Sequence, residues 1–179
     1  MSFVMKRIIR FGLLIMPIII TIGCCNEERL DYYNPDVKLF VKQLKAGTYH
    51  TKSPLGVVEV PLFNEEDVPE LLQYSDDLTK IHSFPLPSVS SCEGEACIGE
   101  CMLWIVETIR IGRIASLGYR LVHADAENYE RIYFLSDEEV LEAGVFYHKW
   151  WEEVKNIPPS PSAYSYTIDP LQGSKYRWW

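Results

Sequence analysis

The sequence predicts an all-α domain, a compact bundle of about four helices with irregular loops and an aromatic C-terminal tail. Apolar residues recur at helical spacing in four segments that also carry capping or stop signals. No segment shows a convincing alternation of apolar and polar residues, so we expect at most one short β-hairpin. The chain has 179 residues, of which 47% are hydrophobic and 23% charged, which fits one globular domain.

The first two helices are predicted from their termini. Asn34 is a candidate N-cap for the first helix, and Gly47 is a candidate left-handed stop. Asn64 and Asp67 have the spacing of a capping box that begins the second helix, and Pro69 should distort its first turn. Each helix has an apolar stripe: Val37, Phe40, Val41 and Leu44 in the first, and Leu71, Leu72, Ser75 and Leu78 in the second.

The last two helices should form the centre of the domain and its C-terminal side. The segment 96–112 is apolar most of the way round, which is typical of a central helix. A capping box from Ser136 to Glu139 begins the fourth helix, which ends before Pro158. We expect the helical domain to span 34–157 and the tail, 158–179, to fold back on it. The segment 119–135 should be a short hairpin or a loop.

The N-terminus reads as an export signal. Lys6, Arg7 and Arg10 precede an apolar run at 11–22 that is too short to cross a bilayer. The sequence Thr21-Ile22-Gly23-Cys24 then resembles a bacterial lipobox. We therefore predict a signal peptide at 1–23, acylation (palmitate) of Cys24 and a tether at 24–33, the alternative being an uncleaved N-terminal anchor.

Removing this signal makes the chain strongly acidic. The mature protein keeps 14 of the 17 Lys and Arg residues beside 25 Asp and Glu, so its net charge is 14 − 25 = −11. This excess argues against a nucleic-acid partner bound through its phosphates. Anionic membranes repel such a body, so the lipid must provide the anchoring.

Three cysteines have the spacing C-x4-C-x3-C. Cys97 and Cys101 lie one helical turn apart, which is too far for an easy disulfide, whereas Cys92 could pair with either, most simply with Cys97. The alternatives are buried free thiols or a metal site. A metal site would need a fourth ligand, and no nearby histidine supplies the spacing, so we predict no metal and no cofactor.

Two carboxylates in the third predicted helix are the only catalytic candidates. Glu100 and Glu107 are seven residues apart, about 10.5 Å along a helix, which is wider than the separation in glycosidases. Glu107 and Arg110 suit an ion pair, and a buried Glu100 would need a partner. The common hydrolase and nucleotide-binding motifs are absent from the sequence, so we assign no catalytic residue.

Aromatic side chains are the candidate contacts for a ligand or partner. Trp150, Trp178, Trp179 and Tyr176 could stack on a sugar or a protein, or could simply pack on the domain. Because adjacent helical residues point about 100° apart, only one of Trp150 and Trp151 can sit in the buried stripe, and we expect Trp151 there.

Four stretches resemble a known family. They are Asn34-Pro35-Asp36-Val37 running to Leu44; Glu66-Asp67-Val68-Pro69 with Leu71-Leu72; Phe84-Pro85 with Ser90-Ser91; and Gly99-Glu100 with Leu103-Trp104 and Arg110. With the lipobox, they make the chain resemble an uncharacterised family of Bacteroidetes outer-membrane lipoproteins that contain a domain of unknown function. The resemblance implies a mainly helical fold and an outer-membrane location. The acidic run Asn26-Glu27-Glu28 resembles a signal for export to the cell surface.

Three hypotheses for function follow. The first is a lipid-anchored, non-enzymatic binding module with a protein or glycan partner in the cell envelope. The second is a hydrolase that acts on surface glycan or peptide through Glu100 or Glu107. The third is a structural or assembly lipoprotein that docks through its aromatic C-terminus. We prefer the first hypothesis, because the sequence combines an export signal and an acidic body with no catalytic motif.

Overall fold

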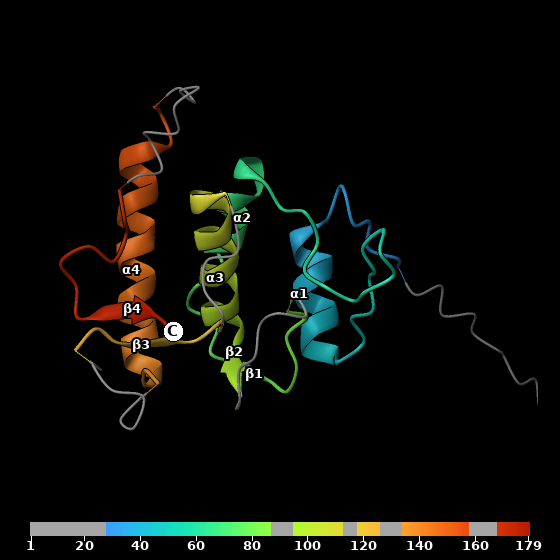
Figure 1. Ribbon diagram of the computed structural model, residues 1–179, viewed down its shortest axis with the longest axis horizontal. Helices are drawn as coiled ribbons and strands as arrows, with labels where there is room; N and C mark the ends of the chain where they lie inside the picture. Colours follow the sequence, from blue (N-terminus) through green and yellow to red (C-terminus); the bar gives the residue numbers. More distant parts are fainter. Residues whose placement is uncertain (1–27, 87–94, 113–117, 126–133, 158–167) are drawn as a thin grey trace, which may run out of the picture.

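The helices and their order follow the sequence pattern closely. The computed structural model describes residues 28–86, 95–112, 118–125, 134–157 and 168–179. Within these residues the four α-helices are α1 (Val37–Ala46), α2 (Val68–Leu72), α3 (Ile98–Ile111) and α4 (Asp137–Val154), and the 3₁₀ helix η1 (Glu65–Asp67) leads into α2 (Figure 1). The mainly helical character predicted from the sequence is confirmed.

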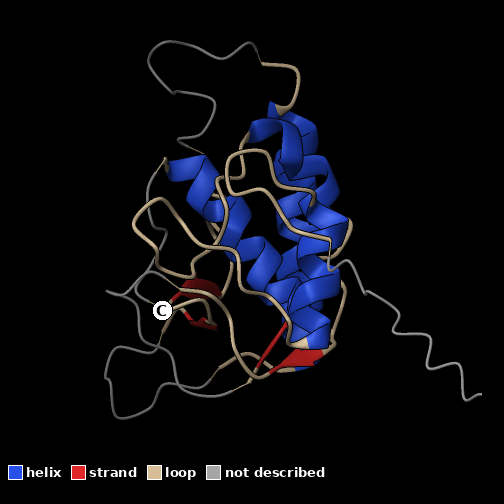
Figure 2. Cartoon of the chain, turned by 90° about the vertical axis from the view of Figure 1, so that its right-hand side faces the viewer, coloured by secondary structure: helices blue, strands red, loops and turns tan. Residues whose placement is uncertain are grey.

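Two small antiparallel sheets accompany the helices in the described part of the chain (Figure 2). In the first, β1 (Lys80–Ile81) pairs with β2 (Ala96–Cys97), and in the second, β3 (Leu121–His123) pairs with β4 (Tyr176–Trp178). The sequence predicted at most one short β-hairpin, whereas the structure has two small sheets made of strands distant in the sequence, so the fold is mostly helical rather than strictly all-α. Strands of two or three residues are too short to show an alternating pattern in the sequence.

The central position of α3 is also confirmed. The helix packs against α2 and α4, and in Figure 1 it stands between α4 on one side and α1 on the other. Every residue from 98 to 107 is buried. Gly99 permits the close approach of the backbone at Ser75, because a Cβ at position 99 would lie 2.4 Å from the Ser75 carbonyl oxygen. The first two residues of the predicted helix, Ala96 and Cys97, form β2 instead.

The helix termini confirm most of the capping predictions. Gly47 has a φ of +65° and ends α1, and complete capping boxes join Asn64 to Asp67 and Ser136 to Glu139. The N-cap of α1, however, is Asp36 and not Asn34, because Asp36 accepts a hydrogen bond from the Leu39 amide at 2.7 Å.

The second and fourth helices are shorter than expected. Before Pro69 the chain forms a 3₁₀ turn, and α2 then ends at Leu72. The apolar stripe predicted for this helix therefore continues beyond it, at Ser75 and Leu78.

The fourth helix, α4, ends at Val154. Its buried tryptophan is Trp150, which packs beside Tyr147 with ring centroids 6.4 Å apart, and Trp151 is only partly buried. The choice of Trp151 for the stripe was wrong.

Residues 28–33, predicted as part of a tether, are packed on the domain. Leu30 is buried, and its carbonyl oxygen accepts a hydrogen bond from Thr51 Oγ1 at 3.3 Å. Gln43 Nε2 donates to the Glu28 carbonyl oxygen at 2.8 Å, and the Leu62 amide donates to the Tyr32 carbonyl oxygen at 2.9 Å. Residues 28–33 therefore belong to the folded domain, which extends closer to Cys24 than the sequence indicated.

Parts of both chain ends lie outside the described residues. The predicted signal peptide, 1–23, and Cys24 lie outside the described residues, as do 158–167 of the C-terminal tail. The described part of the tail folds back on the domain through β4, with Leu171 and Tyr176 buried. Among the described helices, none has the length and apolar character needed to cross a membrane.

Candidate functional site

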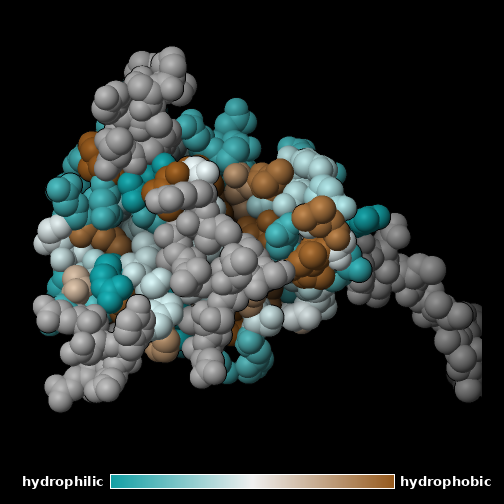
Figure 3. Space-filling view, viewed as in Figure 1, coloured by the Kyte–Doolittle hydropathy of each residue, from teal (hydrophilic) through white to brown (hydrophobic). Residues whose placement is uncertain are grey.

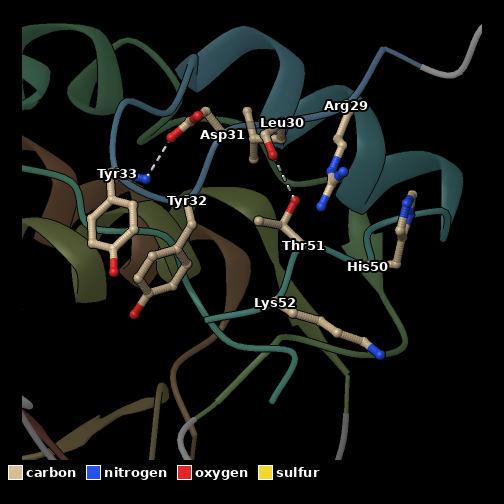
Figure 4. Close-up of a pocket in the computed structure, with 8 residues that line it drawn as sticks. All are labelled: Arg29, Leu30, Asp31, Tyr32, Tyr33, His50, Thr51 and Lys52. Atoms are coloured by element: carbon tan, nitrogen blue, oxygen red, sulfur yellow. Dashed lines mark hydrogen bonds between the residues drawn. The ribbon is translucent and has the colours of Figure 1, made fainter. Parts of the chain in front are cut away.

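A pocket lies beside the start of the folded domain. It has a volume of about 690 Å³ and is formed by two segments, 29–33 and 50–52, which we call the N-terminal pocket (Figure 4). Eight residues line it: Arg29, Leu30, Asp31, Tyr32, Tyr33, His50, Thr51 and Lys52. The hydrogen bond from Thr51 to the Leu30 carbonyl holds the two segments together.

A tight turn places two tyrosines on one side of the N-terminal pocket. The Asp31 carboxylate accepts hydrogen bonds from the amides of Tyr33 at 2.7 Å and Asn34 at 2.9 Å. The rings of Tyr32 and Tyr33 meet edge to face, 5.3 Å apart, and the Tyr32 hydroxyl donates to Glu59 Oε1 at 3.2 Å. Tyr33 is 66% exposed, so its ring is available for stacking on a ligand.

The pocket has two cations without acidic partners. Several lysines elsewhere pair with carboxylates, as Lys42 does with Glu28 at 3.3 Å and Lys38 with Glu70 at 3.3 Å. Arg29 and Lys52 form no ion pair with any residue in the described part of the chain, although both line the pocket. Asp31 Oδ1 accepts both backbone hydrogen bonds of the turn. Such a site suits an anionic group, because Arg and Lys bind phosphate, sulfate or carboxylate through charge-assisted hydrogen bonds.

His50 adds a third nitrogen group to this side of the molecule. Its Nδ1 lies 2.8 Å from the Thr48 carbonyl oxygen, so this nitrogen is the donor. The other ring nitrogen remains available, and protonation of the ring would make it a second donor toward an anion.

The aromatic residues proposed from the sequence lie elsewhere. Trp150 and Tyr176 are buried, and the Tyr176 hydroxyl donates to Glu142 at 2.5 Å. Trp178 Nε1 donates to the Tyr147 hydroxyl at 2.8 Å, and the Trp179 amide donates to the Arg120 carbonyl oxygen at 3.1 Å. These side chains serve the C-terminal sheet and its packing, and none of them lines the N-terminal pocket.

Glu100 is a buried carboxylate with partners, as the sequence required. Arg120 Nε lies 2.8 Å from its Oε2, and the Leu121 amide donates to its Oε1 at 2.6 Å. Burial raises the pKa of Glu100 to about 7, against the opposing effect of Arg120. The carboxylate therefore connects α3 to β3.

Glu107 confirms the predicted ion pair with Arg110. Arg110 Nε and Nη2 donate to its two oxygens at 2.8 and 2.5 Å, and the Tyr147 hydroxyl donates to Oε2 at 2.9 Å. Both Glu100 and Glu107 are buried, and neither lines the N-terminal pocket. Their surroundings are those of structural carboxylates rather than of a pair that acts on a substrate in a cleft.

Two of the five cysteines, Cys97 and Cys101, lie in the described residues. Cys97 has a buried free thiol whose pKa is raised by burial, and Cys101 is also buried. Cys92, the predicted disulfide partner of Cys97, lies outside the described residues, as do Cys24 and Cys25. No group of three or more His, Cys, Asp or Glu residues in the described part could hold a metal ion.

Sequence reasoning missed the N-terminal pocket because it assigned 24–33 to a tether. One signal was present: Leu30 and the pair Tyr32-Tyr33 place three large side chains in a stretch that was expected to stay unfolded. The second half of the pocket, 50–52, is joined to the first only by tertiary contacts.

Comparison with known proteins gives a family and no further relative. Searches of curated proteins and of solved structures find no match to the chain. A family model, described as a domain of unknown function (DUF4943), matches residues 31–179. This match covers the whole described fold except its first three residues, and the chain belongs to the DUF4943 family.

Proposed function

We propose that the protein is a lipid-anchored, non-enzymatic binding module of the cell envelope. Acylated Cys24 anchors it in the outer membrane of a Bacteroidetes-type cell, with export to the surface directed by the acidic run after the anchor. The support for this proposal is the positive segment, the short apolar run and the lipobox-like sequence at the N-terminus.

One observation carries the binding function: in an otherwise acidic protein, the N-terminal pocket combines an exposed tyrosine with two cations that have no acidic partner among the described residues. Arg29 and Lys52 lack acidic partners in the described part of the chain, and Tyr33 offers its ring beside them. The pocket therefore suits an anionic group with an adjoining apolar or ring portion, carried by a glycan, a protein or a lipid.

The two other hypotheses have less support. Hydrolysis through Glu100 or Glu107 would need a carboxylate in contact with substrate, whereas both are buried and held by Arg120, Arg110 and Tyr147. Docking through the aromatic C-terminus would need exposed rings, whereas Trp150 and Tyr176 are buried and the Trp178 indole N–H bonds to the Tyr147 hydroxyl.

The anchor is tested by metabolic labelling with an alkyne analogue of palmitate. Wild-type protein should incorporate the label, and Cys24→Ser should not. Cys25→Ser is the matched control, since it removes the neighbouring thiol and should label like wild type. Equal labelling of Cys24→Ser and wild type, or an unlabelled wild type, would contradict the proposal.

A further inference from the structure

We propose that the N-terminal pocket binds the phosphate of anionic phospholipid headgroups in the membrane that holds the anchor. The end of the domain that contains the pocket then lies against the bilayer, with Leu55 at the interface. This inference rests on the proposed function, because it requires an acyl anchor at Cys24.

The chain between the proposed anchor and the domain is short. Only three residues separate Cys24 from Glu28, and a fully extended chain over these four Cα–Cα steps spans only about 14 Å. The Glu28 carbonyl oxygen is fixed to the domain by Gln43 Nε2 at 2.8 Å. Arg29 follows directly, so the pocket is held close to the headgroup layer and cannot swing far from it.

Positive and negative residues are distributed unevenly between the first segment of the domain and the rest of the chain. Residues 28–52 contain five Lys and Arg and three Asp and Glu, so their net charge is 5 − 3 = +2, whereas 53–179 contain nine and 21, a net charge of 9 − 21 = −12. An anionic surface attracts the first segment and repels the second, and this difference orients the domain with the pocket toward the lipid.

An apolar turn, formed by residues 53–58, follows the pocket residue Lys52 directly and is closed by backbone hydrogen bonds. The Ser53 amide donates to the Val57 carbonyl oxygen at 2.9 Å, and the Gly56 amide, at a φ of +79°, donates to the Ser53 carbonyl oxygen at 2.9 Å. At its tip Leu55 is 88% exposed, three residues from Lys52. Val57 and Val58 are also exposed.

The surface view agrees with this placement. Figure 3 shows part of the exposed hydrophobic surface at the right-hand end of the molecule, where α1 and its neighbouring loops lie. This arrangement suits the boundary between the headgroups and the acyl chains of a bilayer. There Leu55 would enter the apolar layer, while Arg29 and Lys52 would meet the phosphates.

The experiment measures how fast single lysines react with an amine-directed reagent. The full-length mature protein is placed in detergent, in phosphatidylcholine vesicles and in vesicles that also contain phosphatidylglycerol, and labelling is read by mass spectrometry. Lys52 should react about fivefold more slowly in the anionic vesicles than in detergent, as expected for one cation at an anionic surface. Lys149 is the internal control: it lies exposed on α4, at the opposite end of the molecule, and has no acidic partner among the described residues.

Two variants test the proposed contacts. Arg29→Gln and Leu55→Asp should each return Lys52 in anionic vesicles toward its reactivity in detergent. Val145→Asp is the matched control, because it places the same charge at an exposed apolar position on α4 and should leave the protection of Lys52 unchanged. Protection that survives both test variants would overturn the inference.

The remaining outcomes separate this inference from the anchor itself. Protein that does not float with vesicles refutes the anchor, and the inference with it. Protein that floats while Lys52 stays fully reactive refutes the inference alone. Equal protection in the two kinds of vesicle, or by inorganic phosphate in detergent, would also overturn it, because the ligand would then not be an anionic membrane.

Discussion

Glu100 shows how one buried charge ties the central helix to the C-terminal part of the fold. Its carboxylate lies next to Arg120 and accepts the Leu121 amide, so both oxygens have partners inside the protein. Burial nevertheless raises the pKa of Glu100 from 4.5 to about 7, and the charged form is therefore costly near neutral pH.

This pKa predicts a pH-dependent stability. The folded protein holds the Glu100 proton more tightly than the unfolded chain does. The contribution of Glu100 to the free energy of unfolding is therefore fully present below about pH 4.5 and is lost as the pH rises through about 7. Glu100 should lower the free energy of unfolding by at most about 3 kcal/mol over this range. Urea unfolding at a series of pH values should show the decline in wild type and a smaller slope in Glu100→Gln. If the free energy of unfolding declined equally with pH in the two proteins, Glu100 would not be the group responsible.

Gly99 and Gly144 approach Ser75 from two different helices, and only one of them lacks room for a methyl group. A Cβ on Gly99 would lie 2.4 Å from the Ser75 carbonyl oxygen, whereas a Cβ on Gly144 would have its nearest contact at 3.4 Å. Gly99→Ala should lower the free energy of unfolding by about 1–3 kcal/mol through overpacking. The control, Gly144→Ala, should change it little, because gained helix propensity offsets the tighter contact. Equal thermal midpoints for the two variants would refute this account of the packing.

At the scale of elements, a chain of hydrogen bonds joins β4 to α3 through α4. Trp178 Nε1 donates to the Tyr147 hydroxyl, which donates to Glu107, which also holds Arg110. Burial raises the pKa of Tyr147 well above its ordinary value, so the hydroxyl keeps its proton and remains a donor. The C-terminal strand is therefore linked to the centre of the fold by polar contacts as well as by the sheet.

Tyr147→Phe tests this connection. The substitution removes one hydroxyl and leaves both the Trp178 indole N–H and the Glu107 carboxylate short of a partner. It should lower the free energy of unfolding in urea by about 1–3 kcal/mol. Tyr33→Phe, at an exposed tyrosine, is the control and should have almost no effect. A loss in Tyr147→Phe no larger than in this control would show that the chain of hydrogen bonds does not support the fold.

The elements also show which features the sequence could predict. Gly47 and the capping box at Ser136 act within a few residues, and they place the end of α1 and the start of α4 correctly. The pairing of 121–123 with 176–178 is a tertiary contact between short, distant segments, so no local pattern predicts it. The N-terminal pocket was missed for the same reason, since the hydrogen bond from Leu62 to Tyr32 folds back a segment that reads locally as a tether.

At the scale of the whole molecule, the fold has two ends of different character. The end with α1 carries the N-terminal pocket, the apolar turn 53–58 and the start of the domain, and the other end carries α4 with acidic residues in its first turn (Figure 1). The proposed anchor at Cys24, four positions before Glu28, would give this asymmetry a consequence, because it would set which end meets the membrane.

The most direct measurement of the central claim is the mass of the N-terminal peptide of the mature protein purified from membranes. The account predicts a chain that begins at Cys24, with the first 23 residues removed and acyl chains on the cysteine. A mature chain that retains Met1 and the apolar run, or one that begins elsewhere with an unmodified Cys24, would contradict it.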